Sequence, residues 1–443
     1  MDCERLHNYE GSDDRSGCGR LNGIRGENER ARTRGRVGQS CQGCLANSRA
    51  RRLVENLNSK IQSEGPVIAE GLFSYQFGGS ERVGVDLALE FKRRGYQVVC
   101  FAFHDSDGPM RAELERAGIR CLDLNYQKFR GVLRRVLYFW KFWRMLRKER
   151  VCALHVHHHG AMILCGIPAR LAGINRVVMT EHGLQALRER ADARRLAVRY
   201  CRFASDITVV EPGQFEYFHK ELGFPVEKLH CIPNGIRIPI RTTTIVAQKR
   251  REFGLGPDVF AFFYVGRLNP VKDLGTLLDA FATLWADGSF RARLYLVGDG
   301  PERAMLEARR DARGLGELVT FLGARSDVSE ILMAADAFVM SSKSEGLPMA
   351  LLEAMAAGVP CIATAVGGIP DLFGDDRGLS VPARDALALA DAMTAIVRSP
   401  ELRQRLVSNA SADLVRHYAL DAIANRYLEL LGLPRTVSGT QAG

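Results

Sequence analysis

Short apolar runs alternate with segments of helical apolar spacing along the chain from residue 66 onwards. Residues 67–73 and 98–103 are apolar runs of strand length, and the segment between them places Val83, Leu87 and Phe91 on one helical face. The same alternation predicts strands at 153–156, 177–180, 207–210, 230–232, 261–265, 294–297, 319–322, 337–340 and 360–363. Because strands that alternate with helices form parallel sheets, the pattern predicts an α/β fold.

Two blocks of this alternation are separated by a segment of different composition. Residues 237–257 are polar and basic and show no clear periodicity, which is typical of an interdomain linker. We therefore predict two Rossmann-like domains with parallel sheets, one over 66–236 and one over 258–415. A C-terminal helix is expected over 416–431, where it can cross back to the N-terminal domain, before a tail over 432–443.

The stretch 337–371 contains a strand, a polar loop, a helix, a second strand and a Gly-rich loop. Pro348 can occupy the first helical position, and Gly358 followed by Pro360 can end the helix. The loop before the helix contains Glu345, and the free backbone N–H groups of a helix N-terminus bind phosphate.

Glu353 lies inside this otherwise apolar helix, between Leu352 and Ala354. A carboxylate in such surroundings needs a partner, because an unsatisfied buried charge is costly. The vicinal hydroxyls of a sugar would suit it.

Cationic and Gly-rich loops follow other strands of the second block. Arg267 and Lys272 come after the strand at 261–265, and Gly367 with Gly368 after the strand at 360–363. In a parallel sheet these loops open on one edge, and two cations with a helix dipole match a diphosphate. Taken singly, the cations could be surface residues and the acids solvated helix residues. Their joint placement favours a binding site.

The net charge of +10 favours an anionic partner, such as nucleotide phosphate, acidic lipid or nucleic acid. The eleven cysteines are odd in number and scattered, so a reducing cytosol is expected. No apolar run approaches the length of a membrane-spanning helix, which is about 18 residues or more. Residues 1–20 have no apolar core of a signal peptide. These features predict a cytoplasmic protein.

The basic segment 1–65 is low in apolar residues, and we predict it to be mostly disordered, with a short helix near residues 50–61. Its clustered arginines could contact nucleic acid. A solvated tail or an upstream start codon explains them better, so no nucleic-acid partner is expected.

Three small groups resemble metal ligands. Cys41 and Cys44 form a lone CxxC, Asp105 and Asp107 form a D-x-D pair, and three histidines follow one another at 157–159. None is completed by further ligands at suitable spacing, and we interpret the histidines as the ligand-facing end of a strand. We therefore expect no metal and no bound cofactor.

Residues 128–150 form a strongly basic segment with apolar residues at helical spacing. The apolar residues are Phe129, Val132, Leu133, Val136, Leu137, Trp140 and Trp143, and Glu149 is the single acid among nine cations. Such a helix can lie on an anionic bilayer. The alternative is that the same apolar stripe packs on the sheet while the arginines are solvated.

Several motifs together resemble those of the family-four glycosyltransferases, which have the GT-B architecture of two facing Rossmann-like domains. They are Gly78-Gly-Ser-Glu81 with Arg94-Gly95, Glu181-His182-Gly183, Ile232-Pro-Asn-Gly-Ile236, Val265-Gly-Arg-Leu-Asn-Pro-Val-Lys272-Asp273, Val297-Gly-Asp-Gly-Pro-Glu302, and Glu345-x7-Glu353 followed by residues 354–360. They occur in the family's order and cover roughly residues 66–430, with the tail 1–65 outside.

The resemblance implies roles in binding a sugar-nucleotide donor. Arg267 and Lys272 would neutralise its diphosphate. Glu345 would contact the hydroxyls of the donor sugar, and Glu353 would hold the ribose hydroxyls. The backbone amides after Glu345, at Gly346, Leu347 and Met349, would support phosphate and sugar.

The resemblance also implies contributions from the N-terminal domain. Gly79 would approach the phosphates through its backbone, and His182 would lie near the anomeric carbon and the acceptor. The expected reaction retains the anomeric configuration and needs no metal, because Arg267, Lys272 and the helix N-terminus stabilise the leaving diphosphate.

The sequence therefore predicts a retaining, metal-independent glycosyltransferase that uses a nucleotide-sugar donor, with UDP as the expected nucleotide. The expected acceptor is lipid-linked or a polysaccharide, and residues 128–150 would hold the enzyme on the cytosolic membrane face. The alternatives with the same fold are a nucleotide-sugar epimerase and a non-catalytic sugar-nucleotide-binding protein.

Overall fold

The computed structural model describes residues 65–104, 107–124, 132–286, 288–289, 291–374 and 376–435, with only the backbone of 132–135. The predictions for the tail 1–64, for Cys41 and Cys44, for Asp105, for residues 128–130 and for residues 436–443 lie outside these ranges.

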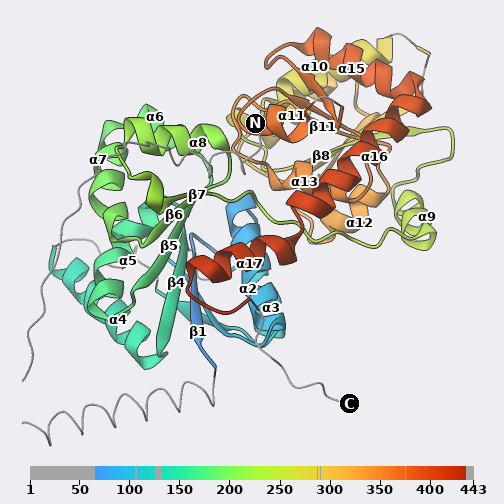
Figure 1. Cartoon of the computed structure of the whole chain (residues 1–443). Coiled ribbons are helices and arrows are strands. Elements are labelled where there is room, and N and C mark those ends of the chain that lie inside the picture. The colour runs from blue at the N-terminus through green and yellow to red at the C-terminus, as the bar shows by residue number, and fades with distance from the viewer. Residues whose placement is uncertain are drawn as a thin grey trace, which may run out of the picture. The chain divides into compact units, whose positions relative to one another are not determined.

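The first half of the described chain is built on a seven-stranded parallel sheet with the order β3-β2-β1-β4-β5-β6-β7. Its strands are β1 Val67–Leu72, β2 Gln97–Ala102, β3 Arg120–Asp123, β4 Val151–His157, β5 Arg176–Glu181, β6 Asp206–Val209 and β7 Leu229–Cys231. The helices are α2 Gly79–Arg93, α3 Pro109–Arg116, α4 Val132–Lys148, α5 His159–Leu171, α6 Gln185–Glu189, α7 Ala191–Tyr200 and α8 Pro212–Glu216. Figure 1 shows them around this sheet.

The second half contains a six-stranded parallel sheet with the order β10-β9-β8-β11-β12-β13. Its strands are β8 Phe260–Val265, β9 Ala292–Val297, β10 Val319–Gly323, β11 Ala337–Met340, β12 Cys361–Thr364 and β13 Leu379–Val381. The helices are α9 Thr243–Glu252, α10 Leu274–Ala286, α11 Arg303–Ala312, α12 Val328–Met333, α13 Met349–Ala356, α14 Ile369–Phe373, α15 Ala386–Arg398, α16 Pro400–His417 and α17 Leu420–Leu430.

Both sheets are Rossmann-like, and both confirm the predicted α/β fold. In each sheet the strand order reverses beside the first strand, between β1 and β4 and between β8 and β11. Ligands of open α/β sheets bind beyond the carboxyl ends of the strands at such a switch point. A ligand-binding site is therefore expected at the loops after β1, β4, β8 and β11.

The segment predicted as a linker without periodicity contains α9, which packs against the second half. Lys249 of α9 is buried and forms ion pairs with Asp327 and Glu330, and Arg250 pairs with Asp336. The sequence pattern missed this helix because few apolar residues, among them Ile245 and Val246, pack against the core, and ion pairs hold the remainder of its inner face.

Two predicted helix starts differ slightly from the structure. Pro348 is the N-cap residue of α13 instead of its first helical residue, and its extended backbone (φ −73°, ψ 123°) lets the preceding loop turn into the helix. Pro301 is likewise suited by its sequence context to the first helical position, but α11 begins at Arg303.

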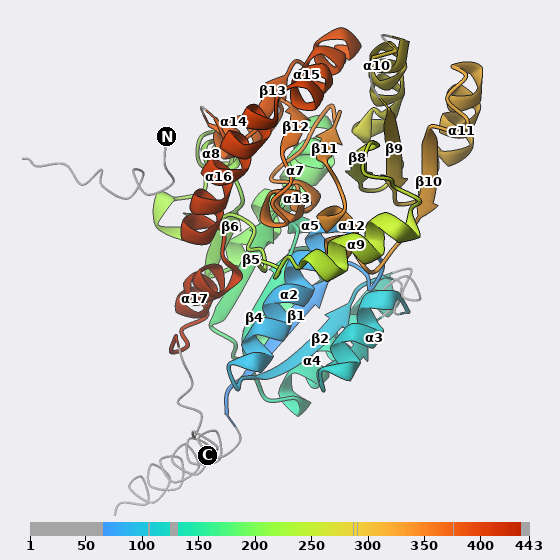
Figure 2. The ribbon, with the colours of Figure 1, turned by 90° about the vertical axis from the view of Figure 1, so that its right-hand side faces the viewer.

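The last helix, α17, lies against the first half of the chain in both views (Figures 1 and 2). It returns beside the outgoing chain, where Ile236 and Ala419 form a parallel bridge. The apolar face of α17 is buried and comprises Leu420, Ile423, Ala424, Tyr427 and Leu428.

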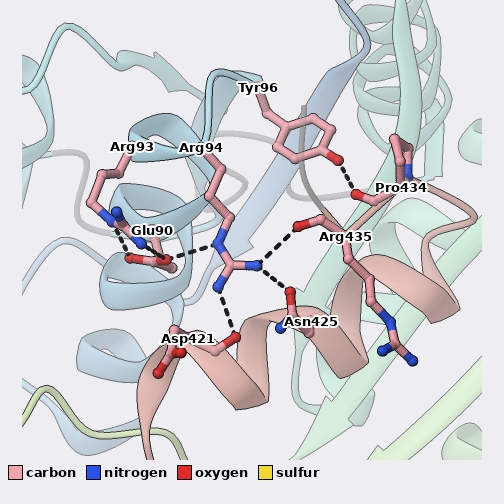
Figure 3. A network of polar contacts seen from close by, with 8 residues as sticks. All are labelled: Glu90, Arg93, Arg94, Tyr96, Asp421, Asn425, Pro434 and Arg435. Carbon is pink, nitrogen blue, oxygen red and sulfur yellow. Dashed lines mark hydrogen bonds and ion pairs between the residues drawn. The ribbon is translucent and has the colours of Figure 1, made fainter. Parts of the chain in front are cut away.

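Polar contacts hold α17 to α2 and the turn after it (Figure 3). Arg94 donates to the carbonyl of Asp421 at 2.7 Å, to the side chain of Asn425, and to Glu90 at 2.8 Å. Tyr96 donates its hydroxyl proton to the carbonyl of Pro434. The Arg94-Gly95 turn therefore anchors the returning helix.

Candidate active site

The loop after β8 carries Arg267 and requires two close backbone approaches. Gly298 has φ +135°, and a Cβ there would lie 1.9 Å from the carbonyl oxygen of Gly266. A Cβ on Gly300 would lie 2.3 Å from the carbonyl oxygen of Leu268. These glycines let the loops after β8 and β9 pack directly on each other, which leaves Arg267 exposed at the edge of the sheet.

The side chains of Lys272 and Glu345 form an ion pair with each other. The Lys272 Nζ lies 2.5 Å from Oε1 of Glu345, and both side chains are largely buried. Ser341 stabilises this arrangement, because its hydroxyl lies 3.0 Å from the carbonyl oxygens of Lys272 and Asp273. The ion pair holds a cation and a carboxylate side by side next to the N-terminus of α13.

The loop from Glu345 to Pro348 is supported by the Gly-rich loop after β12. Gly367 has φ +57°, and a Cβ there would lie 2.0 Å from the carbonyl oxygen of Glu345. The amide of Gly368 donates to the carbonyl of Gly346 at 2.9 Å. Leu347 and Met349 are buried on either side of Pro348. The glycines at 367 and 368 thus fix the loop that carries Glu345.

Glu353 faces α2, against which α13 packs. The pKa of its carboxyl is raised to about 7, chiefly by burial and also by the nearby carboxylate of Asp86, against the opposing effect of Arg82. Arg82 is itself held by ion pairs with Asp86 at 2.5 Å and Glu113 at 2.8 Å. Glu353 is therefore a poorly compensated acid, as expected of a group that awaits a polar ligand.

Gly79 is the first residue of α2, beyond the end of β1. A Cβ on Gly79 would meet no heavy atom within 4 Å, so protein packing does not require a glycine there. Free space beside the backbone is what a closely approaching ligand needs.

His182 follows β5 and contacts a second histidine. Its Nε2 lies 2.7 Å from Nδ1 of His157, whose own Nε2 lies 2.7 Å from Oε1 of Glu70. Glu70 and His157 belong to none of the family's motifs recognised in the sequence. A signal was present, because both are polar residues within otherwise apolar central strands.

The three histidines at 157–159 separate into two environments. His157 points to Glu70, whereas His158 and His159 bond the buried Glu181 at 3.0 Å and 2.7 Å. Burial acts to raise the pKa of Glu181, but the hydrogen bonds from His158 and His159 outweigh it and hold that pKa well below its usual range. Glu181 therefore fixes the turn after β4.

Glu70, His155 and His157 form the one group among the described residues whose ligand atoms lie close enough to hold a metal ion. Oε1 of Glu70 lies 2.9 Å from Nδ1 of His155 and 2.7 Å from Nε2 of His157. His157 forms a hydrogen bond with Glu70, whereas Nδ1 of His155 and Oε2 of Glu70 are buried without a hydrogen-bond partner among the described residues. The absence of a metal remains a prediction.

Loops from the two halves meet around Gly346. A Cβ on Gly346 would lie 2.2 Å from the carbonyl oxygen of His182 and 3.0 Å from Nε2 of Gln214. Asn234 donates its amide to the carbonyl of Leu347 at 2.7 Å. His182 is thus brought next to the loop that carries Glu345, although the two are far apart in sequence.

Comparisons with known proteins agree with this arrangement. Residues 246–413 match the family of "Glycosyl transferases group 1", and residues 77–238 match "Glycosyltransferase Family 4". The chain is 26% identical over 358 residues to the N-acetyl-alpha-D-glucosaminyl L-malate synthase of Bacillus anthracis, covering 79% of this chain and 92% of that protein.

Two relatives have names that concern lipid-linked glycans. The chain is 33% identical over 237 residues to the lipopolysaccharide core biosynthesis glycosyltransferase LpsD of Rhizobium meliloti (47% of this chain, 68% of that protein). It is 27% identical over 305 residues to the UDP-Gal:alpha-D-GlcNAc-diphosphoundecaprenol alpha-1,3-galactosyltransferase of Escherichia coli (64% and 79%).

Among solved structures, the fold is similar to Anabaena HepE in complex with UDP-glucose. The TM-score is 0.72 at 22% identity, covering 83% of this chain and 99% of HepE.

Proposed function

Because the chain belongs to the group 1 glycosyltransferases, with the GT-B fold, we propose that it transfers a sugar with retention of configuration from a UDP-sugar to a lipid-linked or polysaccharide acceptor. The observation that supports this most directly is the Lys272–Glu345 ion pair at the N-terminus of α13, next to Gly346 and His182. The names of the relatives and of the HepE complex support UDP as the nucleotide and a lipid-linked glycan as acceptor.

The proposed roles are those that the family resemblance implies, and the geometry of the site is compatible with each. Lys272 and Arg267 attract the diphosphate, and the amides after Glu345 extend the helix N-terminus toward it. Glu345 keeps Lys272 in place before the donor arrives and then offers its carboxylate to the sugar hydroxyls. Glu353 accepts hydrogen bonds from the ribose, and Gly79 leaves room for the phosphates.

Catalysis in this proposal is mainly the stabilisation of charge on the departing UDP. Preorganised cations and amides cost no reorganisation as that charge develops. His182 lies where the acceptor would approach, next to Gly346. Since protein cations take this role, the reaction is proposed to need no metal, and excess EDTA should leave turnover unchanged.

The central test is sugar incorporation into membranes from radiolabelled UDP-sugars. Glu345→Ala should abolish incorporation, while Glu317→Ala, at an exposed position outside the site, should leave it unchanged. Equal incorporation by Glu345→Ala and the unaltered enzyme would refute the proposed site. Conversion of one UDP-sugar into another without acceptor would instead indicate an epimerase.

The membrane part of the proposal rests on α4. Its buried face consists of Tyr138, Phe142 and Leu146, and not of the predicted stripe. From that stripe, Val136, Leu137 and Trp140 are 59%, 51% and 54% exposed. The interpretation that the whole stripe packs on the sheet is therefore wrong, and exposed apolar residues next to Lys141 and Arg144 favour an anionic bilayer.

A basic groove lies beside α5, the helix that packs against both α4 and α7. It has a volume of about 750 Å³ and lies between α5, α7 and the segment after α7, lined by Arg194, Arg195, Arg199 and Arg202 among others. No helix within the described ranges is long and apolar enough to cross a bilayer. We propose, from the exposed apolar and basic residues of α4, that this helix holds the enzyme on the bilayer surface.

Vesicle co-sedimentation tests the membrane surface. Leu137→Ser with Trp140→Ser should reduce binding to phosphatidylglycerol-containing vesicles about tenfold or more, because buried apolar area contributes to interfacial binding. Leu387→Ser, at a position on α15 that is 67% exposed, is the matched control and should bind normally. Unchanged binding by the double variant would exclude α4 as the contact.

A further inference from the structure

Glu70, His157 and His182 lie on three neighbouring strands or just beyond them. Glu70 is on β1, His157 ends β4, and His182 follows β5, in a sheet where β4 lies between β1 and β5. The contacts are 2.7 Å from Glu70 Oε1 to His157 Nε2 and 2.7 Å from His157 Nδ1 to His182 Nε2. The chain of contacts starts at a fully buried carboxyl group and ends at the histidine next to Gly346.

The positions of the protons follow from the partners. Burial raises the pKa of the Glu70 carboxyl, while the hydrogen bond and the charge interaction with His157 oppose that rise. In its ionised form Glu70 only accepts, so His157 then carries its proton on Nε2 and donates it to Glu70. Burial lowers the pKa of His157 to about 4, beyond the opposing effect of Glu70, so this histidine is neutral at pH 7. Its Nδ1 is then an acceptor, and His182 must donate from Nε2.

We propose that His157, anchored by Glu70, is a positioning residue that fixes His182 in the tautomer with its proton on Nε2 and its lone pair on Nδ1. The inference rests on the proposed function in assigning His182 to the reacting centre. A fixed tautomer gives His182 one defined nitrogen that can accept a proton or a hydrogen bond from a substrate.

His155 provides an internal comparison. It lies on the same strand and places its Nδ1 2.9 Å from the same Glu70 oxygen, but its Nε2 lies 2.7 Å from Thr180 Oγ1 and not near His182. Removing His155 therefore takes away a close neighbour of Glu70 but leaves the contacts of His157 with Glu70 and His182 in place. Only the loss of His157 removes the acceptor for His182.

The first test observes the tautomer directly. In ¹⁵N-histidine-labelled enzyme at pH 7, two-bond ¹H–¹⁵N spectra should show His182 with its proton on Nε2, assigned by the loss of its signals in His182→Gln. His157→Phe should shift His182 toward the Nδ1–H form, and His155→Phe should not. His157→Asn should restore the original form, because its side-chain oxygen can accept from His182.

Turnover gives the second readout, measured with whichever of UDP-glucose, UDP-galactose and UDP-N-acetylglucosamine the enzyme uses with membranes. His157→Phe should lower kcat about 100-fold with KM for the donor changed less than about threefold, as expected for a transition-state role. His155→Phe should stay within about threefold, and His157→Asn should recover most of the loss.

An Nδ1–H tautomer of His182 in the unaltered enzyme would overturn the proposal, even if His157→Phe does not fold. So would a stoichiometric transition metal that is lost from both the His155→Phe and His157→Phe proteins, since Glu70, His155 and His157 would then be its ligands. Full turnover by His182→Ala would contradict the proposed function instead, and the tautomer measurement would still decide the role of His157.

Discussion

Glu353 is the residue at which binding and stability are most clearly opposed. In the folded protein without ligand its pKa is raised to about 7, mainly by burial, against an ordinary value of 4.5. The folded state therefore binds a proton more tightly than the unfolded chain does. The contribution of Glu353 to stability is fully present below pH about 4.5 and is lost as the pH rises through about 7.

Glu353→Gln should therefore stabilise the empty enzyme at pH 8, by on the order of 3 kcal/mol, and have little effect at pH 5. The same variant should bind UDP about tenfold or more weakly, because a neutral amide accepts hydrogen bonds from hydroxyls less strongly than a carboxylate does. Thermal unfolding at both pH values, with and without UDP, measures both effects, with Glu317→Gln as the exposed control. Equal destabilisation at both pH values would contradict the assignment.

For single residues, motifs in the sequence identified the candidate site but not the side chains that each residue contacts. Arg267, Lys272, Glu345 and Glu353 stand in recognisable spacing, and the structure places them around one edge of the second sheet. Glu70 gives no comparable signal, because its role depends on His157 and His182, which lie on other strands. Such a contact depends on strand order and register, which a linear pattern does not specify.

Among the elements, apolar periodicity predicted well wherever an apolar face is buried. It succeeded for α2, whose predicted stripe of Val83, Leu87 and Phe91 is buried. For α4 it left two interpretations open, and the one in which the stripe packs on the sheet is wrong, because Tyr138 and Phe142 are buried while Trp140 is exposed. A helix with apolar residues on more than one side has no unique buried face in sequence, and only the neighbouring sheet selects one.

The contacts that anchor α17 predict a measurable loss of stability when Arg94 is replaced. Arg94→Gln should destabilise the protein by about 2–4 kcal/mol, because it removes contacts to Asp421 and Asn425 and leaves the buried Glu90 with one partner fewer. Arg93→Gln is the matched control, since Arg93 is 64% exposed and pairs with the same Glu90, and it should cost less than about 1 kcal/mol. Urea unfolding measures both. Similar losses in the two variants would mean that Arg94 does not act through α17.

For the molecule as a whole, the contact between the loops of His182 and Gly346 brings residues of both halves into one site. Sequence motifs placed these residues in separate domains and implied that they face each other. They could not specify that a backbone carbonyl from one half occupies the space beside Gly346. That contact depends on the positions that the loops after β5 and β11 take in the folded protein.

Gly346→Ala tests this contact. The added Cβ would lie 2.2 Å from the carbonyl oxygen of His182, so the two loops must separate. Turnover should fall more than about tenfold, because small displacements of catalytic groups are costly, while the unfolding temperature changes little. Gly256→Ala is the control, since a Cβ at Gly256 meets no heavy atom within 4 Å. Normal turnover in Gly346→Ala would show that the reaction does not need this approach.

The return of α17 also has a consequence for how the protein is made. The hydroxyl of Tyr427 lies 3.2 Å from the hydroxyl of Thr180, and α17 packs against α2. The core of the first half is therefore complete only after synthesis of α17, which ends at Leu430. About 200 residues separate β7 from that point, which is roughly 10–40 s of translation at ordinary rates. During that interval the nascent N-terminal half exposes an apolar face on the ribosome, and we expect chaperones to bind it there until synthesis reaches α17.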